Sequence, residues 1–264
     1  SNTFVRRVHA VLQAALKQAV KERLIPYNPC ENCRIPPKDK KEMTILPPEK
    51  IGRYLQEAEK YGVLPMFYLE LSSGLRRGEL LALQWEDLNV KERILTVNKQ
   101  VTRMEGELDV TEPKTKNSVR KVALSQQAVD LLVQEHEQHP DNPILFPSPR
   151  TGGYWSPDAV SRINRKLLKS AGIEEHVRFH DLRHTFATMA ISSGVDVKTL
   201  SSMLGHFSAG FTLDTYTHIT NDMQRGAAEK IGGFMESVTA ANTPEPPDPP
   251  EESRCKVIPF EKVG

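Results

Sequence analysis

The first part of the chain carries hydrophobic residues at the spacing of one helix face, followed by a run of prolines. Val8, Val11, Leu12 and Ala15 belong to this pattern, which predicts an amphipathic helix over residues 4–24. Four prolines and a Lys-Asp-Lys-Lys run then predict an exposed linker without regular structure. Because little sequence surrounds this apolar face, we expect the helix to pack against further segments of a longer protein.

Helical patterns dominate the remainder, with one interval of alternating residues. Around 93–124 the hydrophobic period becomes two, and three short antiparallel strands are predicted about Leu95, Val110 and Val122. The predicted helices run from Leu46-Pro47-Pro48 to about Tyr61, over 65–72, from near Arg76, and over 125–138, 157–171, 181–193, 197–204, 209–219 and 222–237. These patterns predict a mainly α fold with a small antiparallel β-sheet, of the α+β class.

Composition marks the end of the chain as a separate part. Residues 241–264 hold six of the nineteen prolines together with acids and little apolar content, which is typical of a flexible tail. We therefore divide the chain into an N-terminal helix with its linker (1–41), a main domain (42–240) and this tail. No apolar run approaches the roughly 18 residues of a membrane span, so no membrane association is expected.

Charge is unevenly distributed, although the net charge is only +1. Residues 1–41 hold nine lysines and arginines against three acids, whereas the tail is acidic. A basic arm fits a polyanionic partner, although a solvated helix face has the same composition. The candidate contacts to such a partner in this arm are Arg34, Lys38, Lys40 and Lys41.

Three cysteines are too few for a disulfide scaffold, which favours a reducing, cytoplasmic location. The pair Cys30-x-x-Cys33 suggests zinc, but a four-ligand site needs two further ligands. Cys255 lies in the distant tail and no histidine pair is near in sequence, so no metal site and no cofactor are predicted.

Two segments place basic residues where an anion would bind. Gly74-Leu75-Arg76-Arg77-Gly78-Glu79 puts an arginine at a helix N-terminus, where backbone amides already favour negative charge. Pro113-Lys114-Thr115-Lys116-Asn117-Ser118, followed by Arg120 and Lys121, puts lysines at a hairpin tip that can reach DNA. Taken alone, each also fits an ordinary surface turn.

Two later segments add histidines and a tyrosine. In His180-Asp181-Leu182-Arg183-His184, His180 and Arg183 lie three apart and project from one helix face, where they can grip one phosphate. Leu204-Gly205-His206 is followed ten residues later by Tyr216 in a polar, threonine-flanked segment. A metal site built from the two histidines is disfavoured, because Arg183 would repel a cation.

Together these segments resemble the tyrosine recombinase family of phage-type integrases, and within it the integrases of conjugative transposons. The resemblance covers about 42–237, and it makes the helix at 4–24 the end of a truncated core-binding domain. It implies six catalytic residues, which are Arg76, Lys114, His180, Arg183, His206 and Tyr216. Lys116 and Arg120 are further candidate DNA contacts, and Glu79 and Asp181 are expected to support the site.

The implied reaction suits these groups. Two arginines stabilise the charge that grows on a phosphodiester, and a phenol becomes a nucleophile when its proton is removed. His180 is the candidate base, His206 orients the phosphate, and Lys114 protonates the leaving 5′-oxygen. Tyr216 would then hold a 3′-phosphotyrosine intermediate, and the reaction needs neither metal nor nucleotide.

The resemblance also implies partners. We expect double-stranded DNA attachment sites, a homotetramer on DNA, and an excisionase or host DNA-bending protein, with action at the bacterial nucleoid. The family passes a C-terminal element to a neighbouring protomer, for which 222–237 or Val257-Ile258-Pro259-Phe260 is a candidate.

Three alternatives remain open at this stage. Residues 193–205 resemble a helix-turn-helix, which suits a non-catalytic DNA-binding protein but leaves Arg76, Lys114 and Arg183 without a role. A type IB topoisomerase uses a similar residue set, and a hydrolytic phosphodiesterase would leave Tyr216 merely structural.

Overall fold

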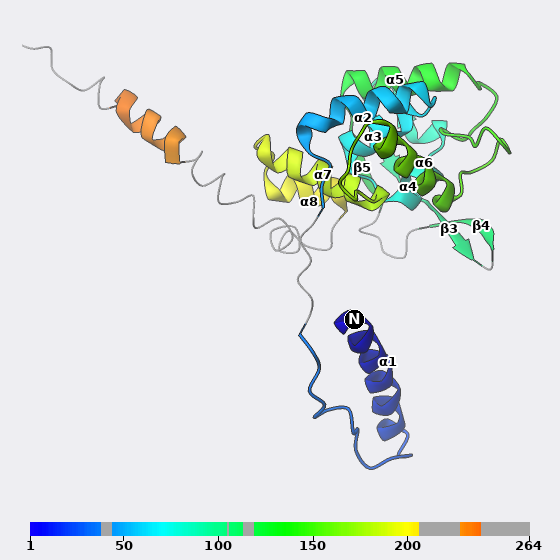
Figure 1. Cartoon of the computed structure of the whole chain (residues 1–264), viewed down its shortest axis with the longest axis vertical. Helices are drawn as coiled ribbons and strands as arrows, with labels where there is room; N and C mark the ends of the chain where they lie inside the picture. Colours follow the sequence, from blue (N-terminus) through cyan, green and yellow to red (C-terminus); the bar gives the residue numbers. More distant parts are fainter. Residues whose placement is uncertain (38–43, 105, 113–118, 206–227, 239–264) are drawn as a thin grey trace, which may run out of the picture. The chain divides into compact units, whose positions relative to one another are not determined.

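The computed structural model describes residues 1–37, 44–104, 106–112, 119–205 and 228–238. The chain divides into two compact units, residues 1–209 and 210–264. In the first unit the helices are α1 (Asn2–Lys21), α2 (Pro48–Lys60), α3 (Leu64–Ser73), α4 (Arg77–Ala82), α5 (Gln126–Glu137), α6 (Pro157–Ser170), α7 (Phe179–Ser192) and α8 (Val197–Leu204), with a 3₁₀ turn at Trp85–Asp87. These bounds confirm the predicted helices of this unit to within a few residues (Figure 1).

The strands are more numerous than predicted. They are β1 (Leu88–Asn89), β2 (Ile94–Val97), β3 (Gln100–Met104), β4 (Glu107–Thr111) and β5 (Arg120–Ala123). All pairs are antiparallel, in one sheet of order β1-β2-β5 and a separate β3-β4 hairpin. β1 spans only two residues, and β3 buries Val101 alone, so neither carries a clear alternating pattern. The mainly α fold with small antiparallel sheets is confirmed.

The core forms where α2, α3, α6 and α7 meet around three aromatic rings. Phe67 of α3 packs edge-on against Tyr54 of α2 and Phe179 of α7, with ring centroids 5.9 and 5.6 Å apart. The buried Tyr54 hydroxyl donates to Asn164 Oδ1 at 2.6 Å, and Asn164 Nδ2 donates to the Val177 carbonyl at 2.9 Å. This chain of bonds satisfies polar groups that would be costly to bury alone, and it ties α6 to α2.

The break between α3 and α4 determines where the first arginine turn lies. Gly74 ends α3 in the left-handed conformation, with φ of 60°. An added Cβ at this position would lie 2.3 Å from Cδ1 of Phe186 and 3.0 Å from Cδ2 of Leu204. Glycine is therefore required both by the backbone angle and by the close approach of α7 and α8.

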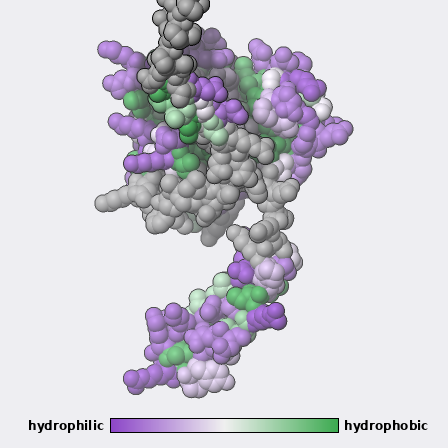
Figure 2. Space-filling model, turned by 90° about the vertical axis from the view of Figure 1, so that its left-hand side faces the viewer, coloured by the Kyte–Doolittle hydropathy of each residue, from purple (hydrophilic) through white to green (hydrophobic). Residues whose placement is uncertain are grey.

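The first helix, α1, contributes no side chain to a buried core. α1 buries none of its residues, and Phe4, Val8, Val11 and Leu12 are exposed. Figure 2 shows hydrophobic surface among hydrophilic side chains on this segment. The exposed apolar face agrees with the expectation that further helical sequence packs there, which stays a prediction.

In the second unit the structure describes one helix, over 228–238, which confirms the later part of the helix predicted at 222–237. The predicted helix at 209–219 lies outside the described residues. Across the described part of the chain, no helix is long and apolar enough to span a bilayer.

Gly74→Ala should lower the free energy of unfolding by about 2–5 kcal/mol, because it combines left-handed backbone strain with overpacking against Phe186. Gly172→Ala is the matched control, since Gly172 has φ of 65° and nothing within 4 Å of its added Cβ. That control should cost only about 1–2 kcal/mol, from strain alone. Denaturant unfolding of the two variants checks this, and equal losses would contradict the packing argument.

Candidate functional site

The first arginine turn is built by a reciprocal cap at the start of α4. Arg76 is the N-cap residue, and its backbone N–H donates to Glu79 Oε2 at 2.9 Å. Its guanidinium Nη1 donates to Glu79 Oε1 at 2.7 Å. The same carboxylate therefore caps the helix and orients the arginine side chain, which remains 39% exposed.

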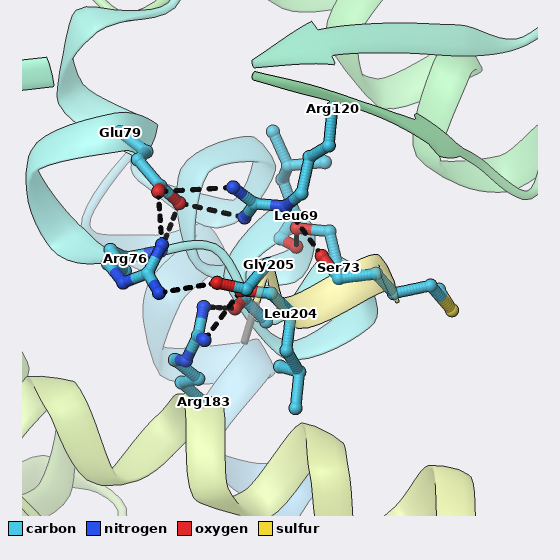
Figure 3. Close-up of polar contacts among 10 residues, drawn as sticks. Leu69, Ser73, Arg76, Glu79, Arg120, Arg183, Leu204 and Gly205 are labelled. Carbon is cyan, nitrogen blue, oxygen red and sulfur yellow. Dashed lines mark hydrogen bonds and ion pairs between the residues drawn. The ribbon is translucent and has the colours of Figure 1, made fainter. Parts of the chain in front are cut away.

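Arg183 lies close to Arg76, although it comes from a helix much later in the chain. It is buried in α7 and donates from Nη1 to the Gly74 carbonyl at 2.7 Å and from Nη2 to the Leu204 carbonyl at 2.6 Å. Arg76 Nη2 donates to the next carbonyl, that of Gly205, at 2.8 Å. The C-terminal turn of α8 thus holds two arginines that are 107 residues apart in sequence (Figure 3).

The α8 turn suits this role because its carbonyls face away from the helix without intrahelical partners. Gly205 is a left-handed cap with φ of 62°, which ends the helix and frees these carbonyls. The negative end of the helix dipole adds to the attraction of both guanidinium groups.

A third arginine completes the cluster. Arg120, at the start of β5, donates from Nη1 and Nη2 to the two oxygens of Glu79, at 3.1 and 2.8 Å. Its Nε donates to the Met203 carbonyl at 2.7 Å. Although burial opposes ionisation of Glu79, the bonds to Arg120 and then Arg76 outweigh it and hold its pKa below the usual range.

The expectation that Arg120 contacts DNA directly does not fit this position. Its side chain is only 6% exposed, and all three kinds of guanidinium nitrogen donate to protein acceptors. The sequence pattern missed this because an arginine beside a lysine-rich hairpin tip looks like part of the same basic surface. We therefore correct its assignment from a DNA contact to a member of the buried cluster.

The cluster carries a net positive charge. Three guanidinium groups face the single ionised carboxylate of Glu79. Burial raises the pKa of the nearby Glu70 carboxyl well above its usual range, which disfavours a negative charge on Glu70. Burial, with Arg76 next in importance, lowers the pKa of Arg183 to about 10, which leaves this side chain charged at pH 7.

Two histidines lie on the first turns of α7 beside this cluster. His180 is exposed, while His184 is partly buried, and their rings meet edge-on with centroids 5.2 Å apart. Partial desolvation and then the charge of Arg183 lower the pKa of His180. Partial desolvation and His180 lower the pKa of His184 to about 4, so both rings are neutral at pH 7.

Asp181 supports the start of α7 rather than facing the arginine cluster. Its Oδ2 accepts from the backbone N–H and Nε of Arg178, at 2.8 and 2.9 Å, and its Oδ1 accepts from Arg178 Nη2 at 2.7 Å. These bonds to Arg178, against the opposing effect of burial, lower the pKa of Asp181. The expected supporting position is thus a helix cap.

A basic pocket that the sequence did not reveal opens next to His180. Its volume is about 560 Å³, and its lining includes Arg77, Arg165, His176 and Arg178. No carboxylate belongs to its lining residues, although Asp181 pairs with Arg178 nearby. These residues come from three separate segments, so only the folded chain brings them together.

Several expected site residues lie outside the described part of the chain. They are Lys38, Lys40, Lys41, Lys114, Lys116, His206 and Tyr216. Arg34 is described and exposed. Arg77 turns away from the arginine cluster and donates from Nη1 to Ser161 Oγ at 2.7 Å. Of the six expected catalytic residues, the structure therefore brings together Arg76, Arg183 and, on the same helix, His180.

Comparisons with known proteins agree with this arrangement. The model of the phage integrase family matches residues 46–223. The chain is 30% identical over 248 residues to the ICEBs1 integrase of Bacillus subtilis (strain 168), a match that covers 89% of this chain and 67% of that protein. It is 28% identical over 263 residues to a XerC-like tyrosine recombinase of Caldanaerobacter subterraneus, with the same coverage of each.

Solved structures share the fold. A Tn1549 transposon integrase in complex with a circular intermediate DNA superposes with a TM-score of 0.75 at 22% identity, covering 87% of this chain and 79% of that one. A lambda integrase tetramer bound to a Holliday junction gives a TM-score of 0.57 at 22% identity, covering 76% and 58%. With the family model matching most of its length, the chain belongs to the phage integrase family of tyrosine-type site-specific recombinases.

Proposed function

We propose that this recombinase cuts and rejoins DNA strands at the ends of a mobile element, and that Arg76 and Arg183 bind the scissile phosphate. The observation that carries the proposal is the pair of arginines held on adjacent carbonyls of the α8 turn. An integrase of a conjugative element is among the proteins that the chain resembles, which supports integration and excision as its biological outcome.

The arginine pair suits a phosphodiester that gains charge in the transition state. Among the described residues, each of these guanidiniums donates two hydrogen bonds, so further N–H groups remain for the non-bridging oxygens. Both groups are fixed before DNA binds, and no reorganisation is then needed as charge develops. The raised pKa of Glu70 disfavours a compensating negative charge on that side.

The remaining steps fall to residues outside or beside this cluster. The Tyr216 oxygen attacks phosphorus and forms the 3′-phosphotyrosine, while the bond to the 5′-oxygen breaks. His180 takes the phenolic proton, for which its neutral state at pH 7 is required, and Lys114 supplies a proton to the leaving 5′-oxygen. His206, next to Gly205 in sequence, donates a hydrogen bond to the phosphate. Attack by a 5′-hydroxyl reverses these transfers and releases Tyr216.

We propose that three parts of the chain have separate roles in this reaction. Residues 1–41 contribute the end of a core-binding domain and its basic linker, 42–240 the catalytic domain, and 241–264 a tail that docks on a neighbouring protomer. Arg34, Lys38, Lys40, Lys41 and Lys116 contact the DNA backbone, and the basic pocket beside His180 makes further backbone contacts.

The assembly we propose is a homotetramer on two attachment sites, acting at the bacterial nucleoid with an excisionase or a DNA-bending protein. The lambda integrase, which shares this fold, forms a tetramer on a Holliday junction. A helix-turn-helix protein without catalytic activity is less well supported, because Leu200 and Leu204 of α8 are buried and the α8 turn is occupied by arginines.

Tyr216→Phe should abolish covalent attachment and leave DNA affinity within about threefold, because only the nucleophilic oxygen is removed. A duplex of the element end, nicked near the cleavage position, traps the adduct, which denaturing electrophoresis then detects. The unsubstituted chain should form this adduct. An adduct with the Phe variant would assign the nucleophile elsewhere, and its absence from both proteins on every cognate end would favour a binding protein.

Arg76→Ala should slow cleavage by about a hundredfold to a thousandfold, with a much smaller change in affinity, because a fixed donor to the transition state is lost. Arg77→Ala is the matched control, since the neighbouring side chain bonds Ser161 instead. Because Arg77 also lines the basic pocket, its variant should lose DNA affinity but keep the cleavage rate at saturating DNA. Single-turnover cleavage at saturating DNA measures both variants. Equal defects in the two would contradict the assignment of Arg76 to the phosphate.

A further inference from the structure

The N-terminal segment brings together three side chains that the sequence separates. His9 lies on α1, 21 residues before Cys30, and Cys33 follows in the segment that returns along this helix. One ligand atom of each residue lies within 4.8 Å of the others. Sequence reasoning found only the two cysteines here, because the histidine becomes a neighbour only when the chain turns back after α1.

Backbone and side-chain bonds hold this cluster in place. Asn28 Nδ2 donates to the Gln13 carbonyl of α1 at 3.2 Å, and Asn28 Oδ1 accepts from the Cys30 N–H at 2.9 Å. The Cys33 N–H donates to the Cys30 carbonyl at 3.3 Å, which closes a tight turn between the cysteines. Nε2 of His9 lies 3.2 Å from that same carbonyl, so the ring is directed at the turn.

We propose that His9, Cys30 and Cys33 bind one zinc ion, which fastens the segment after α1 to this helix. One imidazole and two thiolates are ligands that Zn²⁺ prefers, and a carboxylate-loving ion such as Mg²⁺ would not take them. With Zn–S near 2.3 Å and Zn–N near 2.1 Å, tetrahedral ligand atoms lie roughly 3.5–3.8 Å apart, which small side-chain rotations reach. Water fills the fourth position.

Binding releases the two thiol protons to solvent and leaves a site with no net charge. Both cysteines are free thiols in the structure, with Cys30 buried and Cys33 exposed. Cys33 Sγ donates at 3.5 Å to the Pro29 carbonyl, a weak bond that a metal would replace. The zinc would fix the segment just before the basic linker, and so the direction in which the linker leaves α1.

The test is titration of the reduced full chain with Co²⁺, followed by competition with Zn²⁺. One equivalent should give thiolate-to-cobalt charge-transfer absorption and the visible bands of tetrahedral Co²⁺. His9→Gln and Cys33→Ser should each weaken binding at least tenfold, and neither residue is buried. Cys255→Ser is the control, because the proposal gives no role to this third cysteine, which lies outside the described residues, and the affinity of this variant should be unchanged.

Three results would overturn the zinc site. Equal affinity of the unsubstituted chain and Cys33→Ser would mean that no thiolate pair binds the ion. A loss in Cys255→Ser as large as that in Cys33→Ser would place the metal elsewhere. If the reduced chain takes up no metal, and mild oxidation removes two hydrogens from it, Cys30 and Cys33 form a disulfide pair instead.

A second, independent observation concerns Arg120, and the inference from it rests on the proposed function. Arg120 grips both oxygens of Glu79, and Glu79 in turn binds the guanidinium of Arg76. Its Nε donates to the carbonyl of Met203. This residue directly precedes the two residues whose carbonyls hold Arg183 and Arg76. Figure 3 shows this side chain between Glu79 and the α8 turn.

We infer that Arg120 is a positioning residue, which fixes Arg76 through Glu79 and holds the α8 turn through Met203. Without it, the buried carboxylate of Glu79 would lose its strongest partner and would draw Arg76 inward, away from the phosphate. Arg120 also begins β5, so it links the strand that follows the Lys114 segment to the arginine cluster. One side chain thereby connects three parts of the proposed active site.

The test compares cleavage of an ordinary scissile phosphate with cleavage of a neutral methylphosphonate at the same position. Arg76→Ala should lose much more rate on the charged substrate than on the neutral one, because its role is charge neutralisation. Arg120→Met, which keeps much of the side-chain volume, should show the same selective loss, at least tenfold on the phosphate, with DNA affinity within threefold. Arg120→Lys should recover part of the rate.

Failure of this inference is distinguishable from failure of the proposed function. If the unsubstituted chain forms the covalent adduct but Arg120→Met slows both substrates equally, Arg120 is only structural. If Arg120→Met instead weakens affinity and lowers the salt dependence of binding, it contacts DNA after all. If the unsubstituted chain forms no adduct, the proposed function itself fails.

Discussion

The arginine cluster of this molecule depends on one short piece of backbone, the C-terminal turn of α8. Three successive carbonyls, of Met203, Leu204 and Gly205, accept hydrogen bonds from Arg120, Arg183 and Arg76. A helix end offers such acceptors because its last carbonyls have no partner within the helix. In most proteins water or a capping group donates to these carbonyls, whereas here three guanidinium groups do.

Because the arginine cluster is buried, its stability depends closely on how its charged groups are placed. Three guanidiniums in a small volume repel one another, as the lowered pKa of Arg183 reflects, after the larger effect of burial. Glu79 offsets part of this repulsion, whereas burial disfavours a compensating negative charge on Glu70. The residual positive charge is tolerable because oriented carbonyls surround it, and a bound phosphate would relieve it further.

Much of the fold and part of the candidate site could be predicted from the sequence. Helix bounds followed from apolar spacing, and the order of Arg76, Arg183 and His180 with their neighbours indicated the family before any geometry was known. β1 was missed because two residues are too few to show an alternating pattern, and β3 because it buries only one valine. Arg120 was misassigned because its burial depends on Glu79, 41 positions earlier, and no local pattern encodes that contact. The His9 cluster was missed for the same reason.

The close approach at Gly74 has a consequence for how such a domain can change over evolutionary time. Its backbone carbonyl holds Arg183, while its missing side chain makes room for Phe186 and Leu204. The packing of the core and the position of Arg183 therefore depend on the same few atoms. A larger ring or a shifted helix at this point would displace Arg183 as well, so substitutions in this part of the interior are expected to occur together.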